Sequence, residues 1–310
     1  MTDTMNIAII GAGAVGSLLA GYLSPLANVR FISRRAASAI EPYTVTLRHR
    51  DGAETAVSVY ATADPMQTSG WADVALICVK TFDTDYAARV AATTLTADGI
   101  AITLQNGLGN VEKLAAVLGE NRAVAGVSTN GATLLSPRTV YHSGVGHIQL
   151  AIWDAVAEGV QSVRQLFETA GLSCTTVENV DTVLWGKLII NAGVNALTAI
   201  LGQKNGFLAD VPPAQAMLVD AVLEAVAVAD ALGVTLPYDD PVARVLQVAE
   251  ATRETRSSML SDVTRHNRTE IDAINGEIVR HGTVQGIAVP VNRMLVRLIH
   301  ALEMGYGVPG

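Results

Sequence analysis

The first half of the chain alternates short β-branched apolar runs with segments of helical periodicity. The apolar runs cover residues 6–10, 29–33, 74–79 and 100–104, and the first helical segment covers residues 15–23. Such alternation predicts a parallel sheet with helices on both faces. Further apolar runs at residues 43–48, 57–60, 138–142 and 146–152 predict additional strands, partly antiparallel near a sheet edge.

The pattern changes after the apolar run at residues 174–177, because strand alternation disappears toward the C-terminus. Helical periodicity follows over residues 181–201, 213–232, 242–260, 270–281 and 290–303. We therefore expect a Rossmann-type α/β dinucleotide-binding domain over residues 1–178 and an all-helical domain over residues 179–310. A chain of 310 residues is long enough for two domains with separate cores.

A glycine motif, Gly11-Ala12-Gly13-Ala14-Val15-Gly16, follows the first apolar run and opens the first helix, as the dinucleotide-binding pattern GxGxxG requires. The three glycines have separate predicted roles, with a tight turn at Gly11, close approach to a pyrophosphate at Gly13, and helix packing at Gly16. The diphosphate would lie at the positive end of the helix dipole. The alternative is a glycine-rich turn without a ligand, and the coincidence of strand, motif and helix favours dinucleotide binding.

The second predicted strand ends at Ser33-Arg34-Arg35, where an NAD-specific site usually carries an acidic residue for the ribose hydroxyls. A hydroxyl and two guanidinium groups suit a 2′-phosphate instead, so NADP(H) is the expected cofactor. The alternative is a solvated basic loop. Lys80 and Asn106 also follow predicted strands, at the edge where open α/β sheets bind their ligands.

Three polar residues, Lys187, Asn191 and Asn195, recur every four positions in the otherwise apolar segment 184–197. On a helix this spacing places them on one face. One ammonium and two amides among hydrophobic neighbours suit the wall of a binding cleft. The alternative is a lysine that extends to solvent and amides that cap neighbouring elements. Beside a redox cofactor, a partly buried lysine can donate a proton to a carbonyl oxygen.

Composition excludes several other function classes. The net charge is −8 and no basic cluster is interleaved with aromatic residues, so nucleic acid is not an expected partner. Charged residues interrupt the longest apolar runs and the N-terminus lacks a basic region, so we expect a cytoplasmic protein without a membrane span. The two cysteines, Cys78 and Cys174, lack the spacing of a metal or redox motif, and no metal site is expected.

Several motifs together resemble the ketopantoate reductase family, 2-dehydropantoate 2-reductases that use NADPH in pantothenate biosynthesis, over essentially the whole chain. The markers are Gly11-x-Gly13-x-x-Gly16, Gln105-Asn106-Gly107, Trp185-x-Lys187-x3-Asn191-x3-Asn195, Ser257-Ser258-Met259-Leu260-x-Asp262 and Thr269-Glu270-Ile271-Asp272-x2-Asn275-Gly276. The resemblance implies that the Rossmann-type domain is followed by a helical domain similar to the C-terminal domain of 6-phosphogluconate dehydrogenase.

The resemblance also implies roles for individual residues. Lys187 matches the catalytic lysine, Glu270 a carboxylate that supports catalysis, and Ser258 a hydroxyl that binds the substrate carboxylate. The family's substrate-binding asparagines are matched by Asn106, Asn191, Asn195 and Asn205, and Asn106 would also lie beside the nicotinamide. The family's cofactor-binding lysine and arginine are matched by Lys80 and Arg34. Without the resemblance, Glu270 would be interpreted as a solvated helix charge and Ser258 as part of a local cap.

Two positions depart from the family pattern, Thr255 and Asn130, where some members have asparagine and histidine. They bear on the identity of the substrate more than on the reaction class. Three functions are therefore compared below: reduction of ketopantoate, reduction of another 2-oxo acid with the same lysine chemistry, and NADPH binding by a regulator without turnover. The apolar helix at residues 214–232 is either domain core or a homodimer interface.

Overall fold

The structure, a computed structural model, describes residues 4–306, which form two compact units. The first unit comprises residues through Gln105 together with Asn110–Val180, and the second comprises Asn106–Gly109 together with the residues from Asp181 onward. The division after Val180 lies close to the boundary expected after residue 178. The assignment of residues 106–109 to the first domain differs from this division, because this turn forms its contacts with the helical unit.

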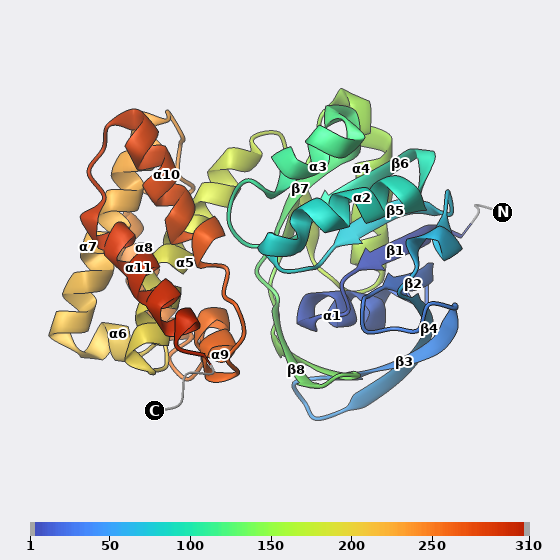
Figure 1. Ribbon diagram of the computed structural model, residues 1–310, viewed down its shortest axis with the longest axis horizontal. Helices are drawn as coiled ribbons and strands as arrows, with labels where there is room; N and C mark the ends of the chain where they lie inside the picture. The colour runs from blue at the N-terminus through green and yellow to red at the C-terminus, as the bar shows by residue number, and fades with distance from the viewer. Residues whose placement is uncertain (1–3, 307–310) are drawn as a thin grey trace. The chain divides into compact units, whose positions relative to one another are not determined.

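The described part of the first unit is built on an eleven-stranded sheet with the order β11-β10-β7-β6-β5-β1-β2-β4-β3-β9-β8 (Figure 1). The strands are β1 Asn6–Ile10, β2 Asn28–Ile32, β3 Glu41–Arg48, β4 Glu54–Thr62, β5 Ala72–Ile77, β6 Leu95–Thr103, β7 Ala123–Ser128, β8 Gly131–Ser136, β9 Thr139–Gly144, β10 Ile148–Ala151 and β11 Cys174–Val177.

The central strands β7-β6-β5-β1-β2-β4 are all parallel, in the order of a doubly wound dinucleotide-binding sheet. Their apolar runs are continuous because both faces of the sheet are covered, and β1 and β5 are almost wholly buried. Antiparallel pairs occur outside this centre, between β3 and β4, β8 and β9, and β7 and β10, which confirms the prediction. Strands β7 and β8 were not predicted, because small residues weaken their apolar pattern.

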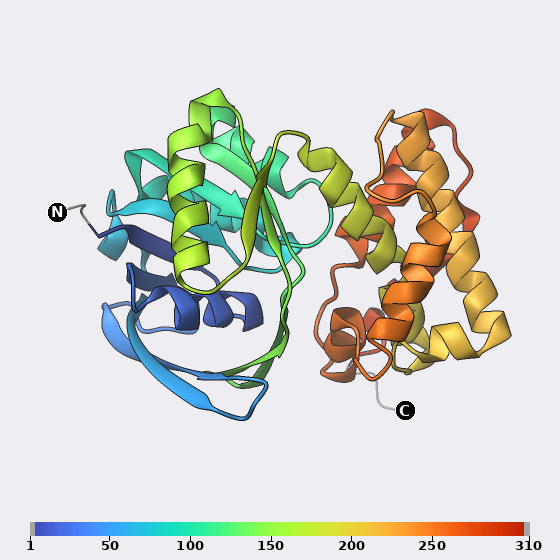
Figure 2. The ribbon, with the colours of Figure 1, turned by 180° about the vertical axis from the view of Figure 1, so that it is seen from behind.

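Helices cover both faces of this sheet, with α2 and α3 packed together on one face and α1 and α4 on the other (Figures 1 and 2). Helix α1 also packs against β3, β8 and β9, so the sheet curls around it. The helices are α1 Ala14–Leu23, α2 Thr84–Thr94, α3 Asn110–Leu118 and α4 Ala157–Thr169, with short 3-10 helices η1 Pro65–Thr68, η2 Thr81–Asp83, η3 Glu120–Arg122 and η4 Asp154–Val156.

The described part of the second unit is helical apart from its connecting loops. Its elements are α5 Val180–Leu201, α6 Phe207–Asp210, α7 Pro212–Ala231, α8 Pro241–Ala251, α9 Ser258–Thr264, η5 Ile271–Ala273, α10 Asn275–Gln285 and α11 Pro290–Met304. Three helices begin with proline, which has a suitable φ and needs no backbone donor at that position.

Two predicted helices of this unit differ from the observed ones. The segment 242–260 is divided into α8 and α9, because the side chain of Ser257 caps a new helix by accepting a hydrogen bond from the Leu260 amide at 3.0 Å. The segment 270–281 is helical in α-form only from Asn275, so Glu270 precedes the helix instead of lying on it.

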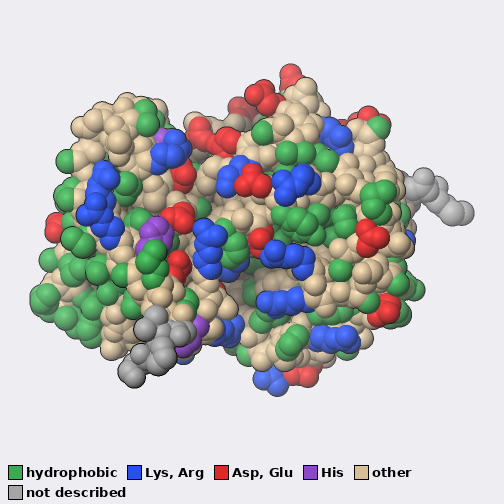
Figure 3. Space-filling view, viewed as in Figure 1, with side chains coloured by type: hydrophobic (Ala, Val, Ile, Leu, Met, Phe, Trp, Pro, Cys, Tyr) green, Lys and Arg blue, Asp and Glu red, His purple; other side chains and the backbone are tan. Residues whose placement is uncertain are grey.

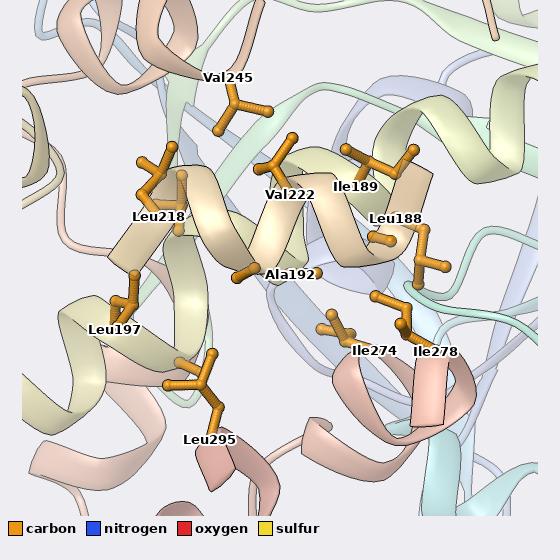
Figure 4. Close-up of a cluster of buried hydrophobic side chains, with 14 of the residues drawn as sticks. Leu188, Ile189, Ala192, Leu197, Leu218, Val222, Val245, Ile274, Ile278 and Leu295 are labelled. Carbon is orange, nitrogen blue, oxygen red and sulfur yellow. The ribbon is translucent and has the colours of Figure 1, made fainter. Parts of the chain in front are cut away.

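Helix α5 forms the centre of the second unit and contributes Leu188, Ile189, Ala192 and Leu197 to its core (Figure 4). A Cβ atom added at Gly193 would lie 2.8 Å from Val222, so glycine permits the close crossing of α5 and α7. Among the described residues, α5 is the helix long and apolar enough to cross a membrane, but 67% of its most apolar window is buried inside the protein. Its apolar character is therefore that of a core helix.

Candidate active site

In the glycine loop between β1 and α1, only one of the three motif glycines has space for an added side chain. Gly11 has a φ of 108°, and an added Cβ would lie 2.8 Å from the Val79 amide. At Gly16 an added Cβ would lie 2.1 Å from the Gly11 carbonyl oxygen. At Gly13 it would meet only the Cys78 carbonyl oxygen, at 3.8 Å. Two glycines thus serve the packing of the loop itself, whereas Gly13 leaves open space in front of it.

This open space lies at the beginning of α1. Gly13 is the N-cap residue and contributes no side-chain hydrogen bond, and the first amides of any helix lack helical acceptors. A bound diphosphate would satisfy these amides and gain from the helix dipole. The residues present therefore fit the diphosphate of a dinucleotide.

The end of β2 carries positive charge that is already paired within the first unit. The Arg34 guanidinium forms an ion pair with Asp83 and lies 5.6 Å from the ring centre of Tyr86. The Ser33 hydroxyl accepts a hydrogen bond from the Arg35 amide at 3.3 Å. Asp83 belongs to η2, and Lys80 is the N-cap residue of that same short helix. The structure thus brings Arg34 and the η2 segment together.

Gln105 fixes the end of β6. Its side-chain amide donates to the Val79 carbonyl at 3.0 Å and to the Thr84 hydroxyl at 2.9 Å, and its Oε1 accepts from the Thr103 hydroxyl at 2.9 Å. These bonds orient the residue immediately before Asn106. The family resemblance marks Gln105 only as part of a motif, and its role as a clamp between two strand ends depends on tertiary contacts.

Lys187 lies partly buried on α5, and burial lowers its pKa from 10.5 to about 8, while the negative charge of Glu270 opposes that shift. A lysine with this pKa is a mixture of ammonium and amine near neutral pH. It can therefore release a proton much more readily than a solvated lysine, which is the property required of a general acid.

Glu270 is buried, with 5% of its surface exposed, and it accepts a hydrogen bond from the Asn106 side-chain amide at 3.2 Å. The interpretation of Glu270 as a solvated helix charge is therefore wrong. Two tethers hold its segment: the Thr269 amide donates to Glu303 Oε1 at 2.7 Å, and the Leu108 amide donates to the Ala273 carbonyl at 3.1 Å. The structure thus brings Asn106, Lys187 and Glu270 together.

Asn191 and Asn195 lie on α5 one and two turns beyond Lys187. Neither side-chain amide forms a hydrogen bond within residues 4–306, and Asn195 is only 6% exposed. Amides that neither cap nor bridge other elements are available to a ligand, because a nearly buried amide gains by pairing with one. The interpretation of these two residues as structural caps is therefore not supported.

Ser258 is exposed at the first position of α9, and its hydroxyl also forms no hydrogen bond within the described residues. Of the two serines, Ser257 is the one that caps the helix, through the Leu260 amide. The Ser257 hydroxyl also accepts a hydrogen bond from the Thr198 hydroxyl at 2.8 Å. Thr198 lies one turn beyond Asn195 on α5. This hydrogen bond therefore holds the start of α9 against the helix that carries the two asparagines.

Asn205 forms local contacts in the loop before α6. Its side-chain amide donates to the Thr252 hydroxyl at 2.9 Å, and its backbone amide donates to the Thr255 carbonyl at 3.1 Å. Its Oδ1 has no partner within the described residues, so the hydrogen bonds of Asn205 do not reach Lys187 or Glu270. Asn130 belongs to the first unit, where its Oδ1 accepts from the Gly146 amide at 2.9 Å.

The sheet order, the glycine loop and the lysine with its carboxylate and amides define a two-domain oxidoreductase that uses a nicotinamide dinucleotide. Family models agree with this class. The model described as "Ketopantoate reductase PanE/ApbA" matches residues 7–155, and "Ketopantoate reductase PanE/ApbA C terminal" matches residues 179–303. The chain belongs to the ketopantoate reductase family, and the resemblance inferred from the motifs is confirmed.

Individual relatives are similar along their whole length. A 2-dehydropantoate 2-reductase from Halobacterium salinarum is 33% identical, over 96% of this chain and 99% of its own. The crystal structure of a PanE/ApbA family ketopantoate reductase from Ralstonia eutropha is 34% identical, with a TM-score of 0.87 over 97% of this chain and 99% of its own. A D-mandelate dehydrogenase, solved with NADH and anilino(oxo)acetate, is 24% identical with a TM-score of 0.86, over 98% of this chain and 100% of its own, and shows the shared fold.

Proposed function

We propose that this protein reduces 2-dehydropantoate to pantoate with NADPH, and that Lys187 is the general acid of the reaction. The observation that carries the proposal is the grouping of Lys187, Glu270 and Asn106 beside the unpaired amides of Asn191 and Asn195. The names of full-length relatives, which are 2-dehydropantoate 2-reductases, support the choice of substrate.

The bound nicotinamide would supply the hydride to the carbonyl carbon of the substrate. Negative charge then develops on the carbonyl oxygen, and the Lys187 ammonium stabilises it and donates the proton that completes the hydroxyl group. The neutral amine afterwards regains its proton from solvent. A pKa of about 8 suits this cycle, because both protonation states are accessible near neutral pH.

Glu270 keeps Lys187 protonated by opposing the effect of burial on its pKa. Glu270 also accepts a hydrogen bond from the Asn106 side-chain amide. This bond holds the Asn106 side chain in a fixed orientation. Asn191 and Asn195 would bind the carbonyl or hydroxyl group of the substrate, and the exposed hydroxyl of Ser258 would bind its carboxylate. Asn205 stays a further substrate-binding prediction from the family resemblance, with its amide nitrogen engaged by Thr252.

We propose NADP(H) as the cofactor, with the backbone of Gly11 to Gly16 at the diphosphate and with Ser33, Arg34 and Lys80 on the ribose side. The exposed Arg34 guanidinium and the lack of an acidic residue at the end of β2 support this choice. The NADH bound to D-mandelate dehydrogenase makes NADH the alternative to be tested.

The test is NADPH oxidation in the presence of ketopantoate and of a panel of 2-oxo acids that includes aromatic ones, with NADH and Lys187→Ala protein as controls. Turnover of ketopantoate that is lost in the variant and is weak with NADH is the expected result. Turnover of another 2-oxo acid alone would keep the mechanism and replace the substrate. Tight NADPH binding without turnover of any substrate would favour the regulator.

We also propose that the protein forms a homodimer through α7 and α11. These helices pack against each other and expose the apolar side chains of Met217, Leu223, Met294, Leu298 and Leu302. Figure 3 shows hydrophobic side chains gathered over the α7 part of the helical unit. A ketopantoate reductase from Staphylococcus aureus, 20% identical, is described as dimeric. Sedimentation analysis of the wild type and of Leu223→Glu tests the proposal, and a wild-type monomer would contradict it.

We propose a cytoplasmic location and a small-molecule 2-oxo acid as the partner, without nucleic acid or membrane. The acidic net charge of −8 and the burial of most of α5 support this proposal. Fractionation of cells that produce the protein is the test, and recovery in the membrane fraction would overturn it.

A further inference from the structure

A chain of polar side chains, half-buried at Glu224 and buried at Asn292 and Asn275, crosses the second unit from α7 to α5. The Glu224 carboxylate on α7 accepts hydrogen bonds from the backbone amides of Val291 and Asn292 at 2.8 and 2.9 Å, and from the Asn292 side-chain amide at 2.8 Å. Asn292 Oδ1 accepts from the Asn275 side-chain amide at 3.0 Å. That same amide donates to the Ala192 carbonyl oxygen on α5 at 3.1 Å.

The carboxylate fixes the orientation of both asparagines. The amide group of Asn292 faces Glu224 and the Ala221 carbonyl, which are both acceptors, so its oxygen must face Asn275. Asn275 must in turn present its amide hydrogens to Asn292 and Ala192. Reversal of either side chain would place oxygen against oxygen. The hydrogen-bond pattern therefore permits one arrangement of the two amides.

This arrangement has a cost that stability alone does not explain. Asn275 and Asn292 are both 0% exposed, and Asn275 Oδ1 has no partner within the described residues. A buried acceptor without a partner destabilises the fold, because it has lost its hydrogen bonds to water and gained none in the protein. Apolar residues of similar size at both positions would remove that cost, so the network points to a function other than stability.

Asn275 connects the two segments that carry the proposed acid and its carboxylate. It lies five residues after Glu270, beyond η5 and the sharp backbone turn at Ile274, which has φ −105° and ψ −91°. Its amide reaches α5 at Ala192, directly after Asn191 and between Lys187 and Asn195. One side chain thus ties residues 270–274, here called the Glu270 turn, to the stretch of α5 between Lys187 and Asn195. The tie is to the backbone of Ala192, whose own side chain lies in the core.

We propose that Asn275, oriented by Asn292 and Glu224, is a positioning residue that fixes the Glu270 turn against α5 and thereby sets the placement of Glu270 relative to Lys187. The inference rests on the proposed roles of Lys187 and Glu270. Asn275 would act by holding the Glu270 carboxylate in place. Its loss should therefore change the acid strength of Lys187, although Lys187 and Glu270 both remain in the protein.

Other titratable groups also lie near this part of α5. Helix α10 carries Glu277, Arg280 and His281, with the His281 ring 5.7 Å from that of Trp185, and the Tyr238 hydroxyl donates to the Gly186 carbonyl at 2.9 Å. Beside Glu270, Arg268 Nη2 lies 3.5 Å from Asp272 Oδ2. Helix α11 adds His300, whose Nε2 lies 2.9 Å from Asp272 Oδ1, and Glu303, which accepts from the Thr269 amide. Glu277→Gln and Asp272→Asn are therefore control variants for a change in local charge.

The experiment is a direct titration of Lys187 by NMR in protein labelled at lysine Cε. The chain has four lysines, Lys80, Lys113, Lys187 and Lys204, so the signals can be assigned with Lys187→Met. In Asn275→Leu the pKa of Lys187 should fall by about 0.5 unit or more, toward its value in Glu270→Gln, because the carboxylate is less well held. The pH profile of kcat should shift in the same direction.

Several variants distinguish positioning from damage to the fold. Asn292→Leu, and the double variant with Asn275→Leu, should give the same shift. The double variant should be no less stable than either single variant, because neither asparagine is left with a buried group that has lost its partner. Val228→Ala, a core truncation on α7, should lower the Tm without a shift. A wild-type pKa of Lys187 in folded Asn275→Leu and Asn292→Leu would overturn the proposal.

Failure of this proposal can be distinguished from failure of the proposed function. The titration uses no substrate, so it measures the effect of Asn275 even if ketopantoate is not reduced. An unchanged pKa in Glu270→Gln as well would contradict the proposed support of Lys187 by Glu270. A shift in Glu270→Gln alone would reject only the role of Asn275.

Discussion

The glycine loop of the first unit and the polar face of α5 in the second unit are built in opposite ways. The loop is made of neighbours in sequence. Its geometry requires glycine at two positions, because Cβ atoms at residues 11 and 16 would collide with backbone atoms. The polar face brings together Asn106, Lys187 and Glu270 from distant parts of the chain. In the loop a substitution acts through shape, whereas on α5 it acts through charge.

The largest effect that this comparison predicts is the loss of activity in Lys187→Met with the fold intact. We expect kcat to fall about 10²- to 10⁴-fold, the usual contribution of a general acid. The pKa of Lys187 is lowered in the folded protein, so the unfolded state binds more protons between about pH 8 and 10.5, and the ammonium destabilises the fold below that range. Removing it should raise stability near neutral pH by about 1–3 kcal/mol.

Kinetic assays and denaturant unfolding at pH 7 and pH 11 check both parts. The stability gain should disappear at the higher pH, where the lysine is neutral in both states. Activity within a few-fold of wild type would remove Lys187 from the mechanism.

Gly13→Ala and Gly16→Ala are a matched pair of variants that distinguishes an effect on cofactor affinity from an effect on stability. At Gly16 the new Cβ would lie 2.1 Å from the Gly11 carbonyl, so the unit must deform, at a cost of about 1–3 kcal/mol or more. Gly13 has φ −85° and ψ −168° and open space before it, so alanine should fit there and block only the diphosphate. Thermal unfolding and NADPH titration should show a lower Tm for Gly16→Ala alone and weaker binding for both, about tenfold or more. Unchanged affinity in Gly13→Ala would contradict the assignment of this loop to the diphosphate.

Glu270→Gln should shift the pH dependence of reduction. The ammonium form of Lys187 is the acid, so the rate should decline above its pKa of about 8 in the wild type. Without the carboxylate charge, burial lowers that pKa further, and the decline should begin at a lower pH. The pH profile of kcat in both proteins measures the shift, with Asp272→Asn as the neutral control. A decline at the same pH in both would show that Glu270 does not support the lysine.

Arg34→Ala should change the cofactor preference and leave the groups around Lys187 unchanged. Loss of a charge-assisted hydrogen bond to a 2′-phosphate costs about 1.5–3 kcal/mol, so the affinity for NADPH should fall roughly 10- to 100-fold with little change for NADH. Arg35→Ala is the neighbouring control. Equal losses for both cofactors would instead assign Arg34 to the structure of η2 through its pair with Asp83.

Local sequence pattern was sufficient to predict the glycine loop and the polar face of α5. The glycine motif requires a strand before it and a helix after it, and the structure has both at β1 and α1. The four-residue spacing of Lys187, Asn191 and Asn195 places them on one face wherever α5 lies, because the helical repeat is constant.

Burial and pairing of the side chains, in contrast, became known only from the folded molecule. Glu270 has the local pattern of a solvated helix charge, yet it is buried and bonded to Asn106, more than 160 residues away in sequence. Asn275 belongs to a family motif, but nothing in the local sequence shows that it or Asn292 is buried, and their fixed orientation comes from Glu224 on another helix. A charge or an amide acquires its properties from desolvation and from its partners, and both depend on segments that local sequence does not specify.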